Sequence, residues 1–158
     1  MSAPRTVEGE IAARGRKIAI VAARFNDFIV ASLLKGATSA WLEHGGLAED
    51  LLVARVPGAF ELPMAARKLA ASGRYDAVIA LGCVIRGGTP HFEYVAGECA
   101  RGVQQAGLES GVPVIFGVLT VDTVEQAIER AAVSAGNKGG ESMEAALEMA
   151  GLLARLGS

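Results

Sequence analysis

The stretch from residue 82 to residue 95, GCVIRGGTPHFEYV, combines residue types that can bind an anion and move a proton. Gly87 and Gly88 leave the backbone uncovered directly after an apolar run, and Thr89 adds a hydroxyl group. Backbone N–H groups at the start of a helix attract a negative charge, and glycine lets a phosphate approach closely. His91 follows, and imidazole is the side chain best suited to proton transfer near neutral pH. The pattern predicts a phosphate site beside a proton-transfer group, or else an ordinary strand-to-helix turn with a solvated histidine.

Three further groups of polar or aromatic residues follow apolar runs, at residues 24–26, 57–61 and 120–122. If the runs are parallel strands, their carboxyl ends lie along one edge of a sheet, which is where ligands bind in α/β proteins. Phe25 is then either a core residue or a ring that stacks on a flat ligand. Glu61 either complements a helix dipole or accepts hydrogen bonds from the hydroxyl groups of a polyol.

Two cations late in the chain, Arg130 and Lys138, flank a turn that contains Gly136 and Asn137. They either clamp a phosphate or are solvated surface charges. No serine or cysteine is placed to act as a nucleophile with His91, which disfavours covalent acyl chemistry.

Four short apolar runs alternate with helical patterns and would position these groups. We expect strands over residues 17–23, 51–56, 77–81 and 114–119. We expect helices over residues 28–44 (capped by Asp27), 62–71, 92–110 and 141–156, and a short helix that is capped by Asp122 or Thr123 and ends near Ala132. Apolar strands that alternate with helices indicate a parallel sheet covered on both faces. The predicted fold class is α/β, a three-layer sandwich around a four-stranded parallel sheet of the flavodoxin-like kind.

Residues 17–158 of the 158-residue chain are predicted to form a single domain. Residues 1–16 are left over, either as a frayed tail or as a strand lent to a neighbouring subunit. These residues lack the apolar core of a signal peptide, and no apolar stretch approaches transmembrane length without a charge or a glycine. A cytoplasmic protein is therefore expected.

The composition narrows the classes of partner. The net charge is −2 and there is no basic run, so neither nucleic acid nor an anionic membrane is an expected partner. Cys83 and Cys99 lack the spacing of a metal site or a disulfide framework, and they are interpreted as buried residues in a reducing compartment. Hydrophobic residues make up 51% of the chain, and the mean hydropathy is +0.36. Either the alanine content or a subunit interface explains these values, and we favour the interface.

Five segments occur in an order that resembles the lumazine synthase family: ARFN, VPGAFELP, GCVIRGGTPHFEYV, FGVLTVDTVEQAIERA and AGNKG. The resemblance runs from about Lys17 to the C-terminus. It implies condensation of 5-amino-6-(D-ribitylamino)uracil with 3,4-dihydroxy-2-butanone 4-phosphate to give 6,7-dimethyl-8-ribityllumazine, with release of phosphate and water. This is the penultimate step of riboflavin biosynthesis, and it implies neither a cofactor nor a metal.

The resemblance also implies which residues meet the pyrimidine substrate. The residues that it places around the ring and the ribityl chain are Phe25, Asn26, Ala59, Phe60, Glu61, Cys83, Val84 and Ile85. In this arrangement the Phe25 ring stacks on the pyrimidinedione and Glu61 accepts the ribityl hydroxyl groups. Residues 83–85 meet the uracil edge mainly through their backbone.

A second set of residues is implied for the butanone phosphate. Gly88 and Thr89 hold the phosphate with help from Arg130, and Lys138 matches a family position near it. His91 moves protons. Phe116 closes the pocket on its aromatic side.

Two other classes of function remain open at this point. A flavodoxin-type flavin carrier would need a Ser/Thr-rich loop after the first strand, and ARFND supplies none; a lumazine-type fold that only binds riboflavin is harder to exclude. The second class is an assembly protein whose shell matters more than its chemistry. For the enzyme we expect a homo-oligomer, at least a pentamer with sites between neighbours. The resemblance also implies an icosahedral shell of pentamers, because the link over residues 134–139 has no insertion and is similar to the short link of family members that form such shells.

Overall fold

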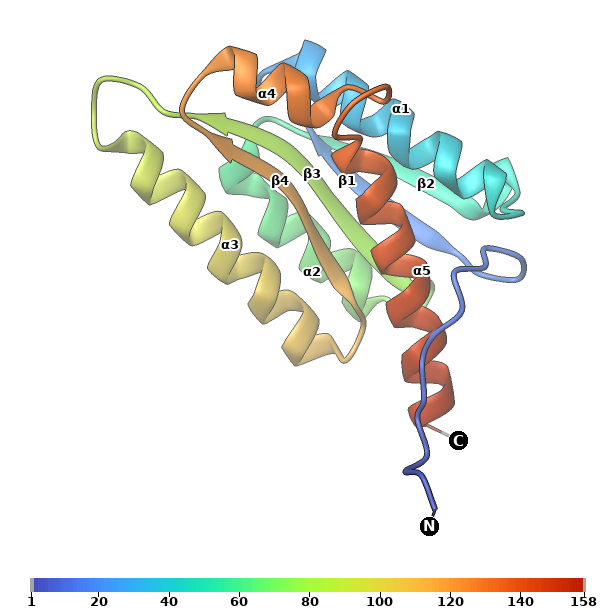
Figure 1. Cartoon of the computed structure of the whole chain (residues 1–158). Helices are drawn as coiled ribbons and strands as arrows, with labels where there is room; N and C mark the ends of the chain where they lie inside the picture. The colour runs from blue at the N-terminus through green and yellow to red at the C-terminus, as the bar shows by residue number, and fades with distance from the viewer. Residues whose placement is uncertain (1, 158) are drawn as a thin grey trace.

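A computed structural model describes residues 2–157, and in this part of the chain four strands form one parallel sheet. The spatial order is β2-β1-β3-β4. The strands are β1 (Ile18–Ala23), β2 (Leu51–Val56), β3 (Ala77–Ile85) and β4 (Val114–Val121). Because all four run in the same direction, their carboxyl ends share the upper edge of the sheet in Figure 1.

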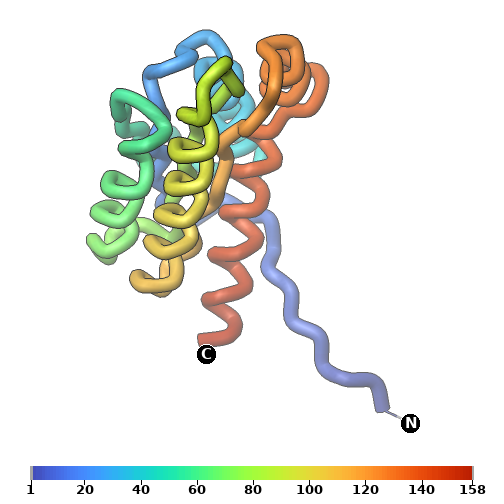
Figure 2. The backbone as a smooth tube through the Cα atoms, turned by 90° about the vertical axis from the view of Figure 1, so that its left-hand side faces the viewer, coloured from blue at the N-terminus to red at the C-terminus, as the bar shows by residue number. Residues whose placement is uncertain are grey.

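Five α-helices cover the two faces of this sheet. They are α1 (Asp27–Glu43), α2 (Leu62–Ala71), α3 (His91–Ser110), α4 (Val124–Ala131) and α5 (Lys138–Leu156), and two 3-10 turns, η1 (Ala48–Asp50) and η2 (Ala59–Glu61), complete the described elements. Helices α1, α4 and α5 pack on one face, and α2 and α3 pack on the other (Figures 1 and 2). The structure therefore confirms the predicted three-layer α/β sandwich.

Alternation along the strands explains why the sheet has two cores. In β1, Ile18 and Ile20 point into the core beneath α1 and α5, where Trp41 is also buried. Ala19 and Val21 point into the core beneath α2 and α3. Successive side chains of a strand point to opposite faces, so a central strand between two helical layers must be apolar at every position.

Strand β2 departs from the expectation of a strand covered on both faces. It lies at the edge of the sheet, and Leu52 and Val53 are each 38% exposed. The apolar run predicted the strand correctly, but the run alone does not reveal which strand stands at the edge.

Several predicted boundaries are wrong by a few residues. Strand β3 continues to Ile85 rather than ending at residue 81, because residues 82–85 pair with Val118–Val121 of β4. Helix α5 begins at Lys138 rather than at residue 141, because the Asn137 side chain caps it and accepts a hydrogen bond from the Gly140 N–H at 3.2 Å. The prediction of a cap at Thr123 for the short helix is confirmed, since its hydroxyl accepts from the Gln126 N–H at 3.1 Å.

The N-terminal segment, residues 2–16, contains neither helix nor strand. Part of it lies against α5: a Cβ atom on Gly9 would stand 1.8 Å from the Glu148 carbonyl oxygen, and Arg155 Nη1 donates to the Glu8 carbonyl oxygen at 3.0 Å. The segment continues away from the helical layers in Figure 2. No helix within residues 2–157 is both long and apolar enough to cross a membrane.

Candidate active site

The carboxyl ends of β1, β2 and β3 enclose a cavity of about 730 Å³ together with the start of α3. Its lining includes most of the residues predicted for the site: Phe25, Asn26, Ala59, Phe60, Glu61, Cys83, Val84, Ile85, Thr89 and His91. These residues come from three separate segments: the residues directly after β1, those directly after β2, and the last residues of β3 with the loop that follows it. Their convergence follows from the parallel sheet, because each strand delivers its next residues to the same edge.

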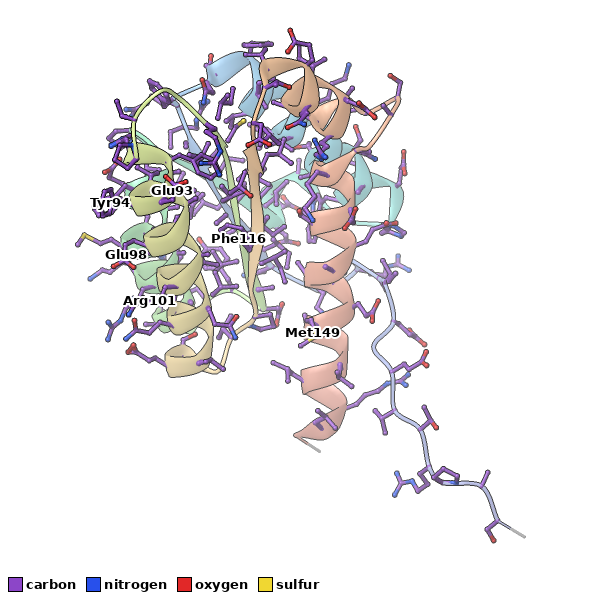
Figure 3. All side chains as sticks on the ribbon, turned by 60° about the vertical axis from the view of Figure 1, so that its left-hand side comes forward. Glu93, Tyr94, Glu98, Arg101, Phe116 and Met149 are labelled. Carbon is purple, nitrogen blue, oxygen red and sulfur yellow. The ribbon has the colours of Figure 1, made fainter. Side chains whose placement is uncertain are left out.

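Four predicted residues do not line this cavity within one chain. Gly88 lies in the loop between the lining residues Gly87 and Thr89. Phe116 lies midway along β4, opposite Ala80, and packs beside the core of the α2–α3 face (Figure 3).

The other two predicted residues that do not line the cavity, Arg130 and Lys138, belong to α4 and α5 on the opposite face of the sheet. Arg130 Nη1 donates to the Gln126 carbonyl oxygen at 3.4 Å, and Lys138 Nζ donates to Glu141 Oε1 at 3.3 Å.

The turn after β1 is held by backbone and side-chain hydrogen bonds. The Arg24 and Phe25 N–H groups donate to the carbonyl oxygens of Val56 and Pro57 at 2.8 and 3.0 Å, which ties the end of β1 to the end of β2. The Phe25 ring is left largely exposed at the cavity. An exposed aromatic face beside a concave surface is available to stack on a flat ligand.

Asn26 has a structural role in this turn. Its backbone adopts a left-handed conformation with φ 61° at the N-cap of α1, and its side-chain Nδ2 donates to the Cys83 carbonyl oxygen at 2.9 Å. The expectation that Asp27 caps this helix is therefore wrong. Asp27 is the first residue of the helix, and its carboxylate accepts from Arg55 Nη2 at 2.9 Å. Asn26 thus ties the turn after β1 to the last residues of β3.

The second wall of the cavity comes from η2. Ala59 is buried, whereas Phe60 and Glu61 are exposed toward the cavity. A Cβ atom on Gly58 would stand 3.3 Å from Glu61 Oε1, so the absence of a side chain at Gly58 leaves room for this carboxylate. Glu61 supplies an acceptor for hydroxyl groups at this wall.

The loop from β3 to α3 is exposed to solvent and is not covered by other parts of the described chain. A Cβ atom on Gly87 or Gly88 would meet nothing within 4 Å, and residues 86–91 are all exposed. His91 is the first residue of α3, so the positive end of a 20-residue helix lies beside Thr89 and the glycines. Among the described residues that line the cavity, none is Lys or Arg.

Cys83 is not available as a nucleophile. Burial raises the pKa of its thiol to about 11, and burial also raises the pKa of Cys99 to about 11. Neither thiol is ionised near neutral pH, in agreement with the expectation that both are buried structural residues.

Some lining residues were not singled out from the sequence. Phe92, Tyr94 and Val95 near the start of α3 also face the cavity. Figure 3 shows Tyr94 at this end of α3. The helical repeat is the signal that could have identified Tyr94 and Val95, because a residue three or four positions after His91 lies on the same helix face.

The fold and the cavity define an α/β protein with an open ligand pocket at the carboxyl edge of a parallel sheet, with aromatic rings at one side and a glycine-rich helix start at the other. Residues 15–154 match the model of the 6,7-dimethyl-8-ribityllumazine synthase family, and the chain belongs to this family. It is therefore an enzyme, a transferase of riboflavin biosynthesis.

Proposed function

We propose that the chain condenses 5-amino-6-(D-ribitylamino)uracil with 3,4-dihydroxy-2-butanone 4-phosphate to form 6,7-dimethyl-8-ribityllumazine. The observation that carries the proposal is the placement of Phe25, Glu61, Thr89 and His91 around one cavity. These four side chains suit a flat ring, a polyol, a phosphate and a proton transfer, which are the chemical features of the two substrates and their reaction.

The pyrimidine substrate occupies the wall formed by the ends of β1 and β2 and by η2. The Phe25 ring stacks on the pyrimidinedione, and Glu61 accepts hydrogen bonds from ribityl hydroxyl groups. The backbone of residues 83–85 faces the uracil edge. The Cys83 carbonyl oxygen already accepts a hydrogen bond from the Asn26 side chain. Asn26 therefore holds the backbone of residues 83–85 in place for the uracil.

The butanone phosphate occupies the start of α3. Gly88 and Thr89 contact the phosphate through the backbone and the hydroxyl group. The amine of the pyrimidine attacks the ketone, water leaves as the imine forms, phosphate is eliminated, and the ring closes with loss of water. Each step moves protons, and His91 stands at the boundary between the two substrates to accept and return them. Holding both substrates in register supplies much of the rate enhancement.

A neighbouring subunit completes the site. The described lining of the cavity contains no Lys or Arg, while Arg130 and Lys138 lie on the far face of the same chain. A cyclic contact between subunits brings Phe116, Arg130 and Lys138 of one chain to the cavity of the next. Two further features fit the same assembly. Strand β2 is a half-exposed edge strand. Residues 2–16 form neither helix nor strand in the single chain, and in the assembly they add a strand to the sheet of a neighbouring subunit. The assembly is a pentamer or a shell of pentamers.

The direct test mixes both substrates with the purified protein and follows the absorbance of the lumazine. Product should appear only when protein and both substrates are present. Static light scattering on the same sample should give at least a pentamer. Absence of turnover would refute the proposed reaction, whereas a monomer or dimer that turns over would refute only the shared site.

A second candidate function is the binding of riboflavin in the same cavity. The exposed rings of Phe25, Phe60 and Tyr94 around one cavity favour it, because they would stack on any flat ring system. A purified protein that is yellow because it retains stoichiometric flavin would establish this second function.

A further inference from the structure

Arg86 lies between two residues that line the cavity, Ile85 and Gly87, but its own side chain is not part of the lining. Its Nε atom donates to Asp122 Oδ1 at 2.9 Å, and its Nη1 atom donates to the carboxylate of Glu93. The guanidinium carbon also stands 4.4 Å from the centre of the Phe92 ring. One side chain thus contacts three others.

These contacts join the two ends of the open loop. Arg86 precedes the loop, and Phe92 and Glu93 follow it in the first turn of α3. The third partner, Asp122, directly follows β4, and its backbone N–H donates to Gln126 Oε1 at 2.8 Å. The backbone N–H of Arg86 adds a bond to the Val121 carbonyl oxygen at 2.8 Å. The loop is therefore closed across its base and fixed to the neighbouring strand.

The charges favour this arrangement. The hydrogen bond to Glu93, followed by that to Asp122, raises the pKa of Arg86, and the hydrogen bond from Arg86 lowers the pKa of Glu93. All three charged side chains are substantially exposed, and exposed ion pairs add little to the global stability of a fold. The main effect of the cluster must therefore be local, on the loop that it spans.

That loop needs a restraint. Gly87 and Gly88 have no contacts at the Cβ position, and glycine has more backbone freedom than any other residue. The loop carries Thr89 and leads to His91, whose positions must be held closely for phosphate binding and proton transfer.

We propose that Arg86 is a positioning residue that closes the loop over residues 87–91 and holds the phosphate-binding backbone and His91 in their working arrangement. The planar guanidinium suits this task because it binds two carboxylates and stacks on a ring at once. The identity of the phosphate-bearing substrate rests on the proposed function, but the restraint on the loop does not.

The kinetic test compares Arg86→Gln with the wild type. The KM for the butanone phosphate should rise about tenfold, while the KM for the pyrimidine should change less than about twofold, because only the loop is displaced. Arg86→Lys keeps the positive charge but loses the planar group that can bind two carboxylates at once. Its KM for the butanone phosphate should therefore lie between those of the wild type and Arg86→Gln. The matched control is Arg67→Gln, which breaks an exposed ion pair with Glu109 between α2 and α3, away from the cavity. It should leave both KM values unchanged.

Hydrogen–deuterium exchange provides a readout that does not depend on activity. The amide of Glu93, which donates to the Pro90 carbonyl oxygen at 3.1 Å at the end of the loop, should exchange faster in Arg86→Gln than in the wild type, and Arg67→Gln should not differ from the wild type there. If the wild type makes no lumazine, the proposed function fails while the exchange data still decide the role of Arg86. Should Arg86→Gln not fold, the same measurements on Arg86→Lys decide it. Unchanged exchange of the Glu93 amide, or an equal rise in both KM values, would overturn the proposal.

Discussion

Replacing Phe25 by alanine should weaken binding of the pyrimidine substrate without weakening the fold. The side chain is 71% exposed in the single chain, so little core packing is lost. A phenylalanine has about 200 Å² of surface, and the exposed part is therefore about 140 Å². A flat ring that stacks on one face covers about half of this, or about 70 Å². At about 25 cal/mol per Å² the lost burial is about 1.8 kcal/mol, which corresponds to about a 20-fold weaker affinity.

The assay is a binding titration with the pyrimidine substrate, together with thermal unfolding of the same samples. Phe28→Ala is the matched control, because Phe28 is 61% exposed in the first turn of α1 and does not line the cavity. It should bind the pyrimidine as the wild type does. The reasoning is refuted if Phe25→Ala retains wild-type affinity, or if both variants lose affinity equally.

Three further predictions concern proton transfer, the phosphate and the packing of α5. His91→Ala should slow condensation at saturating substrate by up to about a hundredfold and leave pyrimidine binding nearly unchanged; weaker binding with normal turnover at saturation would contradict its role. Arg130→Ala should raise the KM for the butanone phosphate far more than that for the pyrimidine, and equal effects on the two would exclude Arg130 from the phosphate site. Gly139→Ala should lower the free energy of unfolding by about 2–3 kcal/mol, because the new methyl group would stand 1.9 Å from the Leu33 carbonyl oxygen. The control is Gly97→Ala on α3, where an added methyl group would have open space, so the free energy of unfolding should be unchanged or slightly higher. Denaturant unfolding measures both variants, and similar stabilities of the two would contradict the prediction.

The sequence was sufficient to predict the layers of the fold and most of the cavity. Apolar strands that alternate with helices allow few arrangements, and residues that directly follow parallel strands must meet at one edge. For this reason Phe25, Glu61 and His91 could be placed together before their contacts were known.

Two boundaries depended on contacts that the apolar pattern does not contain. The strand predicted over residues 77–81 continues to residue 85, because Gly82–Ile85 pair with Val118–Val121 of a strand that is distant in the sequence. The last helix begins at Lys138 rather than at residue 141, because the Asn137 side chain caps it locally.

Residues whose proposed role depends on assembly could not be assigned to a cavity from one chain. Arg130 and Lys138 lie on the face of the sheet opposite the cavity, and Phe116 lies midway along an edge strand. The sequence pattern gives their positions along the elements but not the subunit whose cavity they would serve. The positions of Arg86 and Asp122 were likewise evident, but not their mutual contact, because it joins two loops through side chains alone.

The most direct test of the proposed reaction is the stoichiometry of its products. With both substrates present, the protein should release one inorganic phosphate for each 6,7-dimethyl-8-ribityllumazine formed, measured by phosphorus NMR and absorbance on the same sample. Phosphate release without lumazine, or neither product at any protein concentration, would contradict the proposal that this cavity condenses the two substrates.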